Sequence, residues 1–250
     1  MLKRLFSFLG GAAAATSSQS AAPTDQAEQA LFRQIAERSK TDPLIGAKIG
    51  AKDVTQRLLN AMKTDRGVHV ESLLCALGSL AGYSCQAALR ALAAARGAPE
   101  TSLLTVIETQ GGKTYFFGDH LNKPLAESQY SVWGLAAGGA QQAGCSSLPD
   151  INEIFKHVTS VVGTDAFGLP RIPEKNKPQD IPINYVRTLW PALFPIISKF
   201  CPNPEHWPIL LSLSIQEVVG MGKAVIDPCL ALQLVMESAV PMSKVNLGAP

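Results

Sequence analysis

The sequence predicts a mainly α protein, a globular bundle of about eight helices with one small β-hairpin. Three observations lead to this class. Capping residues and glycines mark the ends of many segments, apolar residues recur at helical spacing, and two pairs of glycines stand four residues apart within such segments. One stretch, between residues 101 and 117, instead has the β-branched and aromatic composition of strands.

The first helix is expected over residues 25–40, because Asp25 and Glu28 have the spacing of a capping box. The second is expected over residues 53–65. Residues 46–53 superficially resemble a phosphate-binding loop, but they lack its spacing and follow no strand. We therefore expect them to form turns that lead into the second helix.

The third helix, over residues 69–96, has the clearest helical pattern. Its apolar and small side chains form one stripe at a period of 3.6 residues: Val70, Leu73, Leu74, Leu77, Ala81, Ser84, Ala88 and Leu92. Gly78 and Gly82 flank this stripe, and Gly134 and Gly138 repeat the spacing later in the chain. Glycines four apart lie on one helix face and allow another backbone to approach closely. We expect both pairs to mark the tightest contacts of the fold, with their helices facing each other or a third backbone.

The strand-like stretch predicts a hairpin. Residues 101–109 and 114–117 are rich in β-branched and aromatic side chains, and the glycine pair between them suits a tight turn. Because an isolated hairpin is marginally stable in water, we expect it to lie on the helices or to pair with another chain.

Asp150, Asn203 and Asp227 are typical helix caps that mark starts in the second half of the chain. The expected helices there cover residues 127–143, 150–162, 183–200, 204–221 and 228–240. Proline prevents a helix over residues 164–182, so a long loop is expected there. We interpret residues 25–245 as a single helical domain that includes this loop, with a split into 25–163 and 183–245 as the alternative.

Composition excludes several classes of protein. Hydrophobic residues make up 46% of the 250 residues and charged residues 17%, so the main body can bury a sizeable core. The net charge of +2, without any run of Lys and Arg, predicts no nucleic-acid binding. Residues 72–89 lack charged side chains, but their apolar positions are periodic and polar residues are interspersed. A buried helix therefore fits them better than an integral membrane span.

Residues 1–24 are interpreted as a disordered leader or a targeting segment. Lys3, Arg4 and the apolar residues 5–9 outline a short signal peptide, and residues 1–9 could also make a weak membrane-surface contact. The five scattered cysteines form no C-x-x-C motif. Their apolar neighbours indicate small buried side chains rather than bridges or metal ligands. This pattern favours a reducing, cytoplasmic location, with export through an N-terminal signal peptide as the alternative.

Two places could carry acid–base chemistry. Asp119 and His120 follow the hairpin on a loop, where functional polar groups often lie, although a plain turn capped by Asp119 is the simpler interpretation. Glu217 lies in an apolar helix, where it would be either a buried carboxylate or part of a narrow solvent face; we favour the solvent face. Trp133 is the candidate ligand-binding side chain. No metal site and no cofactor are predicted.

The predicted function is a non-catalytic protein–protein interaction or regulatory module, because no recognised catalytic motif occurs in the chain. Its partner would be another protein or a second copy of the chain. The alternative is a small-molecule-binding protein or enzyme with a pocket between helices near Asp119, His120, Trp133 and Glu217. A third class, an exported or membrane-surface protein, depends on residues 1–9.

Overall fold

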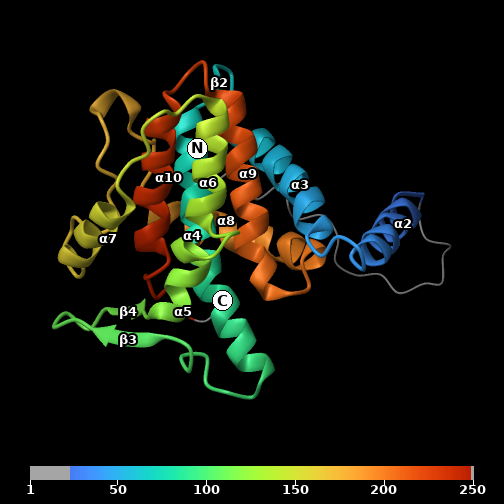
Figure 1. The fold of residues 1–250 in the computed structure, drawn as a ribbon, viewed down its shortest axis with the longest axis horizontal. Coiled ribbons are helices and arrows are strands. Elements are labelled where there is room, and N and C mark those ends of the chain that lie inside the picture. The colour runs from blue at the N-terminus through green and yellow to red at the C-terminus, as the bar shows by residue number, and fades with distance from the viewer. Residues whose placement is uncertain (1–22, 249–250) are drawn as a thin grey trace.

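The computed structural model describes residues 23–248 and confirms the mainly α fold (Figure 1). Eight helices of ten or more residues and two small antiparallel strand pairs lie in this part of the chain. The helices are α2 (Pro23–Arg38), α3 (Ile45–Met62), α4 (Val70–Ala95), α6 (Val132–Ala143), α7 (Ile151–Ser160), α8 (Pro182–Phe200), α9 (Trp207–Gly222) and α10 (Pro228–Met242). The expectations for residues 1–22, including the leader and its membrane contact, lie outside the described residues.

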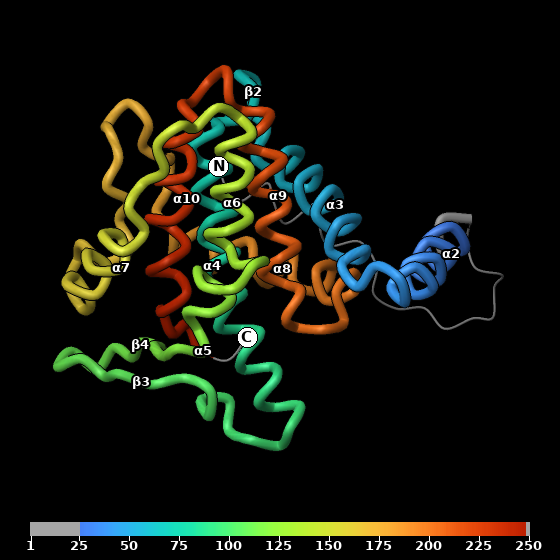
Figure 2. The backbone as a smooth tube through the Cα atoms, in the orientation of Figure 1, coloured from blue at the N-terminus to red at the C-terminus, as the bar shows by residue number. Residues whose placement is uncertain are grey.

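Helix α4 is the centre of the molecule and is surrounded by α8, α9 and α10 (Figure 2). Its residues are buried without interruption from Glu71 to Arg90. At the start of α4, a ring nitrogen of His69 accepts a hydrogen bond from the backbone amide of Ser72, which satisfies part of the first turn. One described helix, α4, is long and apolar enough to cross a membrane, and 94% of that apolar stretch is buried inside the protein.

The first glycine pair confirms the close-packing prediction. A Cβ atom at Gly78 would lie 2.5 Å from the carbonyl oxygen of Val235, and one at Gly82 would overlap the carbonyl oxygen of Ala239. Both of these carbonyls belong to α10. The two helices therefore approach through their backbones, an arrangement that any side chain larger than hydrogen would prevent.

The second pair does not pack in this way, and that prediction is wrong. A Cβ atom at Gly134 would meet only its own N-terminal loop, and one at Gly138 would come no closer than 3.8 Å to Gln216. The close contact of α6 lies at Gly139, where a Cβ atom would be 3.0 Å from the Cα atom of Gln216 in α9. The side of α6 that packs against α9 is therefore the side that carries Gly139, and not the side that carries Gly134 and Gly138.

Helix α3 begins at Ile45, eight residues earlier than predicted, so the expected turns over 46–53 are wrong. Gly46 and Gly50 form a third pair with the same spacing inside this helix. A Cβ atom at Gly46 would overlap the carbonyl oxygen of Phe200, and one at Gly50 would lie 2.8 Å from the Phe200 Cβ atom. Close packing against the end of α8 outweighs the low helix propensity of the two glycines.

The expected hairpin is present as β3 (Thr105–Glu108) and β4 (Thr114–Phe117). The strands are antiparallel, and Thr105 pairs with Phe117. The chain after α10 pairs with the far side of β4 at one point, where Tyr115 forms an isolated bridge with Val245. The hairpin thus lies on the helical body and projects from its lower edge (Figure 1). A two-residue pair, β1 (Lys63–Thr64) with β2 (Gly67–Val68), was not predicted.

The proline-rich loop between α7 and α8 is fastened to the body. Arg171 donates hydrogen bonds to the carboxylate of Glu237 in α10. Asn176 donates to Glu71, and the backbone amide of Gln179 donates to the hydroxyl of Ser72, both at the start of α4. Side chains from this loop therefore reach two core helices.

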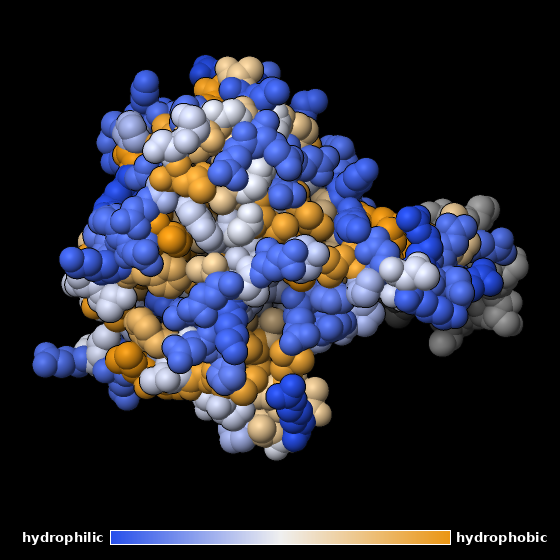
Figure 3. Space-filling model, in the orientation of Figure 1, coloured by the Kyte–Doolittle hydropathy of each residue, from blue (hydrophilic) through white to orange (hydrophobic). Residues whose placement is uncertain are grey.

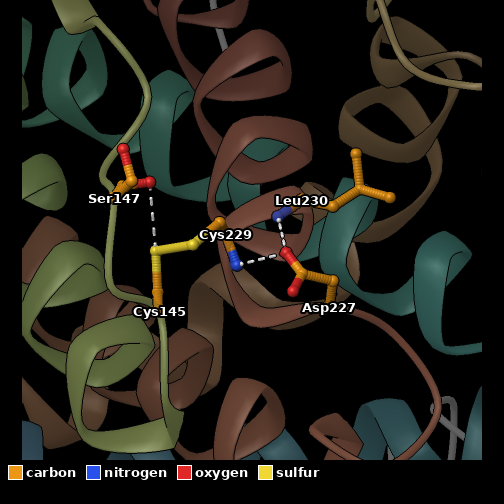
Figure 4. The surroundings of a disulfide bond; sticks show 5 residues. All are labelled: Cys145, Ser147, Asp227, Cys229 and Leu230. Carbon is orange, nitrogen blue, oxygen red and sulfur yellow. Dashed lines mark hydrogen bonds between the residues drawn. A yellow bond between two sulfur atoms is a disulfide. The ribbon is translucent and has the colours of Figure 1, made fainter.

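A disulfide joins Cys145, just after α6, to Cys229 in the first turn of α10 (Figure 4). The expectation that all five cysteines are unbridged is therefore wrong for these two. The Cα atoms are 4.9 Å apart, although 84 residues separate them in the sequence. Beside the disulfide, Asp227 caps α10 as predicted. The other three cysteines are buried and free, as expected: Cys75, Cys85 and Cys201.

Candidate functional site

The predicted pair Asp119 and His120 lies at the start of α5 (Asp119–Asn122), and both side chains are exposed. Gly118 precedes them with φ of 119°, a conformation that side-chain-bearing residues rarely adopt. This glycine turns the chain sharply from the buried strand β4 onto the surface. Asp119 thus begins a short helix, rather than capping a plain turn.

His120 lies at a cleft of about 520 Å³ between α4, the start of α9 and the segment that follows α5. The apolar part of its lining is formed by Ala88, Leu89, Leu92, Pro124, Pro208 and Ile209. Its polar lining includes His120, Lys123, Ser128, Gln129, Tyr130 and Glu205. An apolar surface with a few polar groups around it is the usual form of a small-molecule site.

One side of this cleft is built from an unusual piece of backbone. Residues Lys123–Glu127 form a π-helix, a rare structure that occurs frequently at functional sites. Leu125 anchors the segment in the core with no exposed surface. The segment can therefore present Lys123 and Pro124 to the cleft while its interior side stays fixed.

Trp133 and Glu217, the other two predicted site residues, do not line this cleft. Trp133 is partly buried on α6 and packs against the core. Glu217 is exposed on α9, whereas its neighbour Gln216 donates a hydrogen bond to the carbonyl of Leu135. Glu217 thus lies on a solvent face, as favoured, and of the four predicted residues only His120 contributes to the cleft.

Two glutamates are buried in the part of the chain that the structure describes, Glu71 and Glu237. Glu237 in α10 is the more deeply buried, with a side chain that is 1% exposed. Arg171 pairs with it at 2.6 Å and also binds both carboxylate oxygens of Glu153 in α7. The hydrogen bond from Arg171 lowers the pKa of Glu153. Glu237 stands alone in an apolar stretch of sequence, and this isolation was the available signal for a buried, paired acid.

His69, Glu71 and Ser72 are residue types that can form a nucleophile–base–acid triad. The Ser72 hydroxyl is 2.8 Å from Nδ1 of His69, and Nε2 of His69 is 3.5 Å from the Glu71 carboxylate. However, Ser72 is 2% exposed, and its oxygen also accepts the amide of Gln179. This cluster caps α4 and fastens the long loop, and it leaves a substrate no access to the hydroxyl.

Lys244, just after α10, is 2% exposed. Its ammonium group lies 4.5 Å from the centre of the Phe117 ring and 5.5 Å from that of Phe155. Burial lowers the pKa of Lys244 to about 8, because an apolar environment disfavours the charged form. The two rings offset part of this cost through cation–π attraction. Nothing in the sequence around Lys244 distinguishes it from a surface lysine.

A larger, open groove of about 1140 Å³ lies between α2 and the end of α8. Helix α2, at the right of Figure 1, is attached there through Glu28 and Lys199, which pair at 2.6 Å, and through the rings of Phe32 and Phe200. The lining of the groove also includes Arg33, Asn203 and His206. Burial lowers the pKa of His206.

The outer strand of the hairpin exposes apolar side chains. Val106 is 44% exposed and Ile107 is 43% exposed, although they are consecutive residues of β3 and so point to opposite faces. Apolar surface is visible at the hairpin in the lower left of Figure 3. In contrast, Tyr115 and Phe116 of the partner strand β4 are buried.

Comparison of the chain with family models, curated proteins and solved structures finds no match. Among residues 23–248 there is no group of three or more His, Cys, Asp or Glu side chains that could hold a metal ion. The His120 cleft and the outer edge of β3 are the features of the described structure that bear on function.

Proposed function

We propose that the protein is a non-catalytic helical module that acts through protein–protein contacts made by the open edge of β3. The observation that carries the proposal is the exposure of Val106 and Ile107 on this strand. Natural edge strands are usually blunted by Lys, Pro, a bulge or a covering element, because an unpaired edge is a template for another strand. β3 contains neither Lys nor Pro.

The engagement of two buried polar groups, the Glu237 carboxylate and the Ser72 hydroxyl, supports this proposal. Glu237 is occupied by Arg171, and Ser72 is occupied by His69 and by the long loop. These groups hold segments of the chain together, so their charge and hydrogen-bonding capacity are used within the fold.

A photo-crosslinking amino acid placed at Val106 tests the proposal in cells of the native organism. We expect discrete crosslinked adducts, because a strand docked on the edge would lie within reach of that position. The matched control is the same substitution at Val225, which is 69% exposed and lies between α9 and α10. If position 106 yields no adduct beyond those at position 225, the edge does not bind a protein.

A small-molecule function is the second candidate, and the specific observation in its favour is the cleft at His120. A thermal-shift screen of metabolites tests it, because a ligand at 100 times its dissociation constant stabilises a protein by about 2.7 kcal/mol. A hit at this cleft should lose affinity in His120→Ala and keep it in His157→Ala, since His157 lies on α7. Equal shifts in the two variants would place the ligand elsewhere.

We also propose that the protein works in an oxidising compartment after export, rather than in the cytoplasm. The disulfide between Cys145 and Cys229 supports this location, because such bonds persist mainly outside the reducing cytosol. The basic and apolar residues 3–9 are compatible with a signal peptide. The intact mass of the native protein should show cleavage near residues 15–22 and two hydrogens missing for the disulfide. A full-length, fully reduced protein would contradict this location.

A further inference from the structure

The hydrogen bonds of the hairpin determine which backbone groups of β3 face outward. The amide of Phe116 donates to the carbonyl of Lys244, so Phe116 directs its hydrogen-bonding groups toward the tail after α10. Val106 is opposite Phe116 and therefore belongs to a pair that exchanges no hydrogen bonds within the hairpin. Because the pattern alternates, the N–H and C=O groups of Val106 and Glu108 point away from β4.

This outward edge is the open side of the small sheet. The other side of β4 is closed by the bridge between Tyr115 and Val245. β3 has a single charged residue, Glu108, and presents four backbone groups from Val106 and Glu108 to a docking strand. A second antiparallel strand could use all four.

A second copy of β3 satisfies this edge in one register better than in its neighbours. In an antiparallel, two-fold pairing, only outward-pointing residues can exchange hydrogen bonds across the axis. Pairing Glu108 with Glu108 of the second copy would bring like charges into direct opposition, which destabilises a sheet. Pairing Val106 with Val106 of the second copy would form hydrogen bonds through Val106 only. The outward groups of Glu108 would then find no partner in β3 of the second copy.

The remaining register, with its axis at Ile107, avoids both problems. Val106 then faces Glu108 of the second copy, and this pair occurs twice, so four backbone hydrogen bonds form. Ile107 faces Ile107 of the second copy in a pair without hydrogen bonds, where side chains approach most closely. The single charge of each strand is opposite a valine rather than another glutamate.

We propose that the β3 edge binds the β3 edge of a second copy in this register, forming a two-fold dimer with one continuous sheet. This inference rests on the proposed function and specifies its partner. The contact is short, so it belongs among weak, reversible interfaces rather than among obligate ones.

Cysteine crosslinking at single positions tests both the partner and the register. Cα atoms opposite each other in such a pair are about 4.5 Å apart, within the range that a disulfide can bridge. Under mild oxidation, Ile107→Cys should therefore form a covalent dimer on a non-reducing gel. Val106→Cys should not, because its nearest copy is diagonal and about 7 to 8 Å away. Dimer from Val106→Cys alone would overturn the register, and dimer from neither variant would overturn the proposal.

The mass of the uncrosslinked protein in solution provides an independent measurement. Sedimentation should show a reversible dimer that strengthens as protein concentration rises. Ile107→Lys should weaken it by about tenfold or more, because two ammonium groups would face each other at the axis. Val225→Lys, which adds the same charge far from the hairpin in sequence, should leave the dimer unchanged. A monomer at all concentrations would overturn the dimer.

The two proposals fail in distinguishable ways. If position 106 crosslinks in cells to a different protein while the purified chain stays monomeric, the second copy is the wrong partner and the interaction edge stands. If position 106 gives no specific adduct in cells and the purified chain is monomeric, both the interaction edge and the dimer are wrong.

Discussion

Helices α4 and α6 carry the same sequence feature, a pair of glycines four residues apart, and both contact α10. In α4, the pair lies directly under the α10 backbone at Val235 and Ala239. In α6, Gly134 faces its own N-terminal loop and Gly138 faces only the end of the Gln216 side chain, and a disulfide just beyond the helix ties the chain to α10. The spacing identifies a face that could accept a backbone, but only the neighbouring helix determines whether one is there.

The largest expected effect concerns the covalent tie of α6. Replacing Cys145 and Cys229 by alanine should lower the free energy of unfolding by about 2 to 4 kcal/mol, because the bond closes a long loop in the unfolded chain. Urea unfolding with and without reductant measures this loss. Reductant should destabilise the parent and the Cys201→Ala control alike, and should leave the double variant unchanged. If reductant leaves the free energy of unfolding of the parent protein unchanged, the disulfide does not stabilise the attachment of α6 to α10, and the contrast with the packed helix α4 fails.

Gly82→Ala tests the packed helix. Its new methyl group would overlap the Ala239 carbonyl, a backbone atom that cannot rotate away, so α4 and α10 must separate. We expect a loss of about 1 to 3 kcal/mol in the free energy of unfolding, despite a gain in helix propensity of about 1 kcal/mol. The midpoint of urea unfolding reports the change. A variant more stable than the parent would show that the α4–α10 contact is loose.

Lys244 tests the end of the same contact, where Gln86 of α4 donates hydrogen bonds to carbonyls just after α10. The pKa of Lys244 is about 8 in the folded protein and about 10.4 in an unfolded chain. Between these values the unfolded state binds more protons, so this lysine's cost is fully present below pH 8 and disappears as the pH rises to about 10.4. Lys244→Met should therefore stabilise the protein by about 1 to 2 kcal/mol at pH 7.

The quantity to measure is the difference in stability between Lys244→Met and the parent as a function of pH. Burial raises the pKa of Cys75 and Cys201 to about 12 and also raises the pKa of Cys85, the thiol nearest in charge interaction to Lys244, so these thiols stay protonated in both folded proteins over this range and the difference reports the lysine. The advantage of the variant should shrink between pH 8 and 10. An advantage that is constant with pH would mean that the pKa of Lys244 is the same in the folded and unfolded states, and hence that the folded protein leaves this lysine well solvated.

The smallest effect is expected at Gly134→Ala. Residue 134 is exposed, and its new methyl group would lie 3.1 Å from the Gln129 carbonyl oxygen, a mild contact in a surface loop. Helix propensity should prevail, and the free energy of unfolding should rise by up to about 0.5 kcal/mol. Unfolding curves of Gly134→Ala and Gly82→Ala, measured side by side, should show changes of opposite sign in the free energy of unfolding. A loss above about 1 kcal/mol would instead make α6 resemble α4.

Local signals in the sequence predicted the elements well. Asp150 and Asp227 cap their helices because a short carboxylate can reach the amides two and three residues ahead, whatever the rest of the chain does. The stripe along residues 69–96 predicted the central helix, and strand composition predicted the hairpin. Each of these features depends on atoms within a turn or two of one another.

The candidate site was predictable only in part. His120 could be named because it follows a strand directly, but the cleft beside it requires residues of α4 and α9. The open β3 edge could not be assigned, because a hairpin has one outer edge on each strand, and only the bridge from Val245 to β4 decides that the edge of β3 stays free. Glu237 and Arg171 are likewise 66 residues apart, and neither carries a local sign of the other.

The sequence by itself determined the helical class, most helix ends, the buried character of α4 and the presence of a hairpin. Tertiary structure alone decided that Gly78 and Gly82 face α10, that residues 46–53 are helical, and that Cys145 meets Cys229. The physical reason is range. Capping, propensity and periodicity act within a few residues, whereas close packing and crosslinks depend on which distant faces meet, and that choice is settled only when the whole core is assembled.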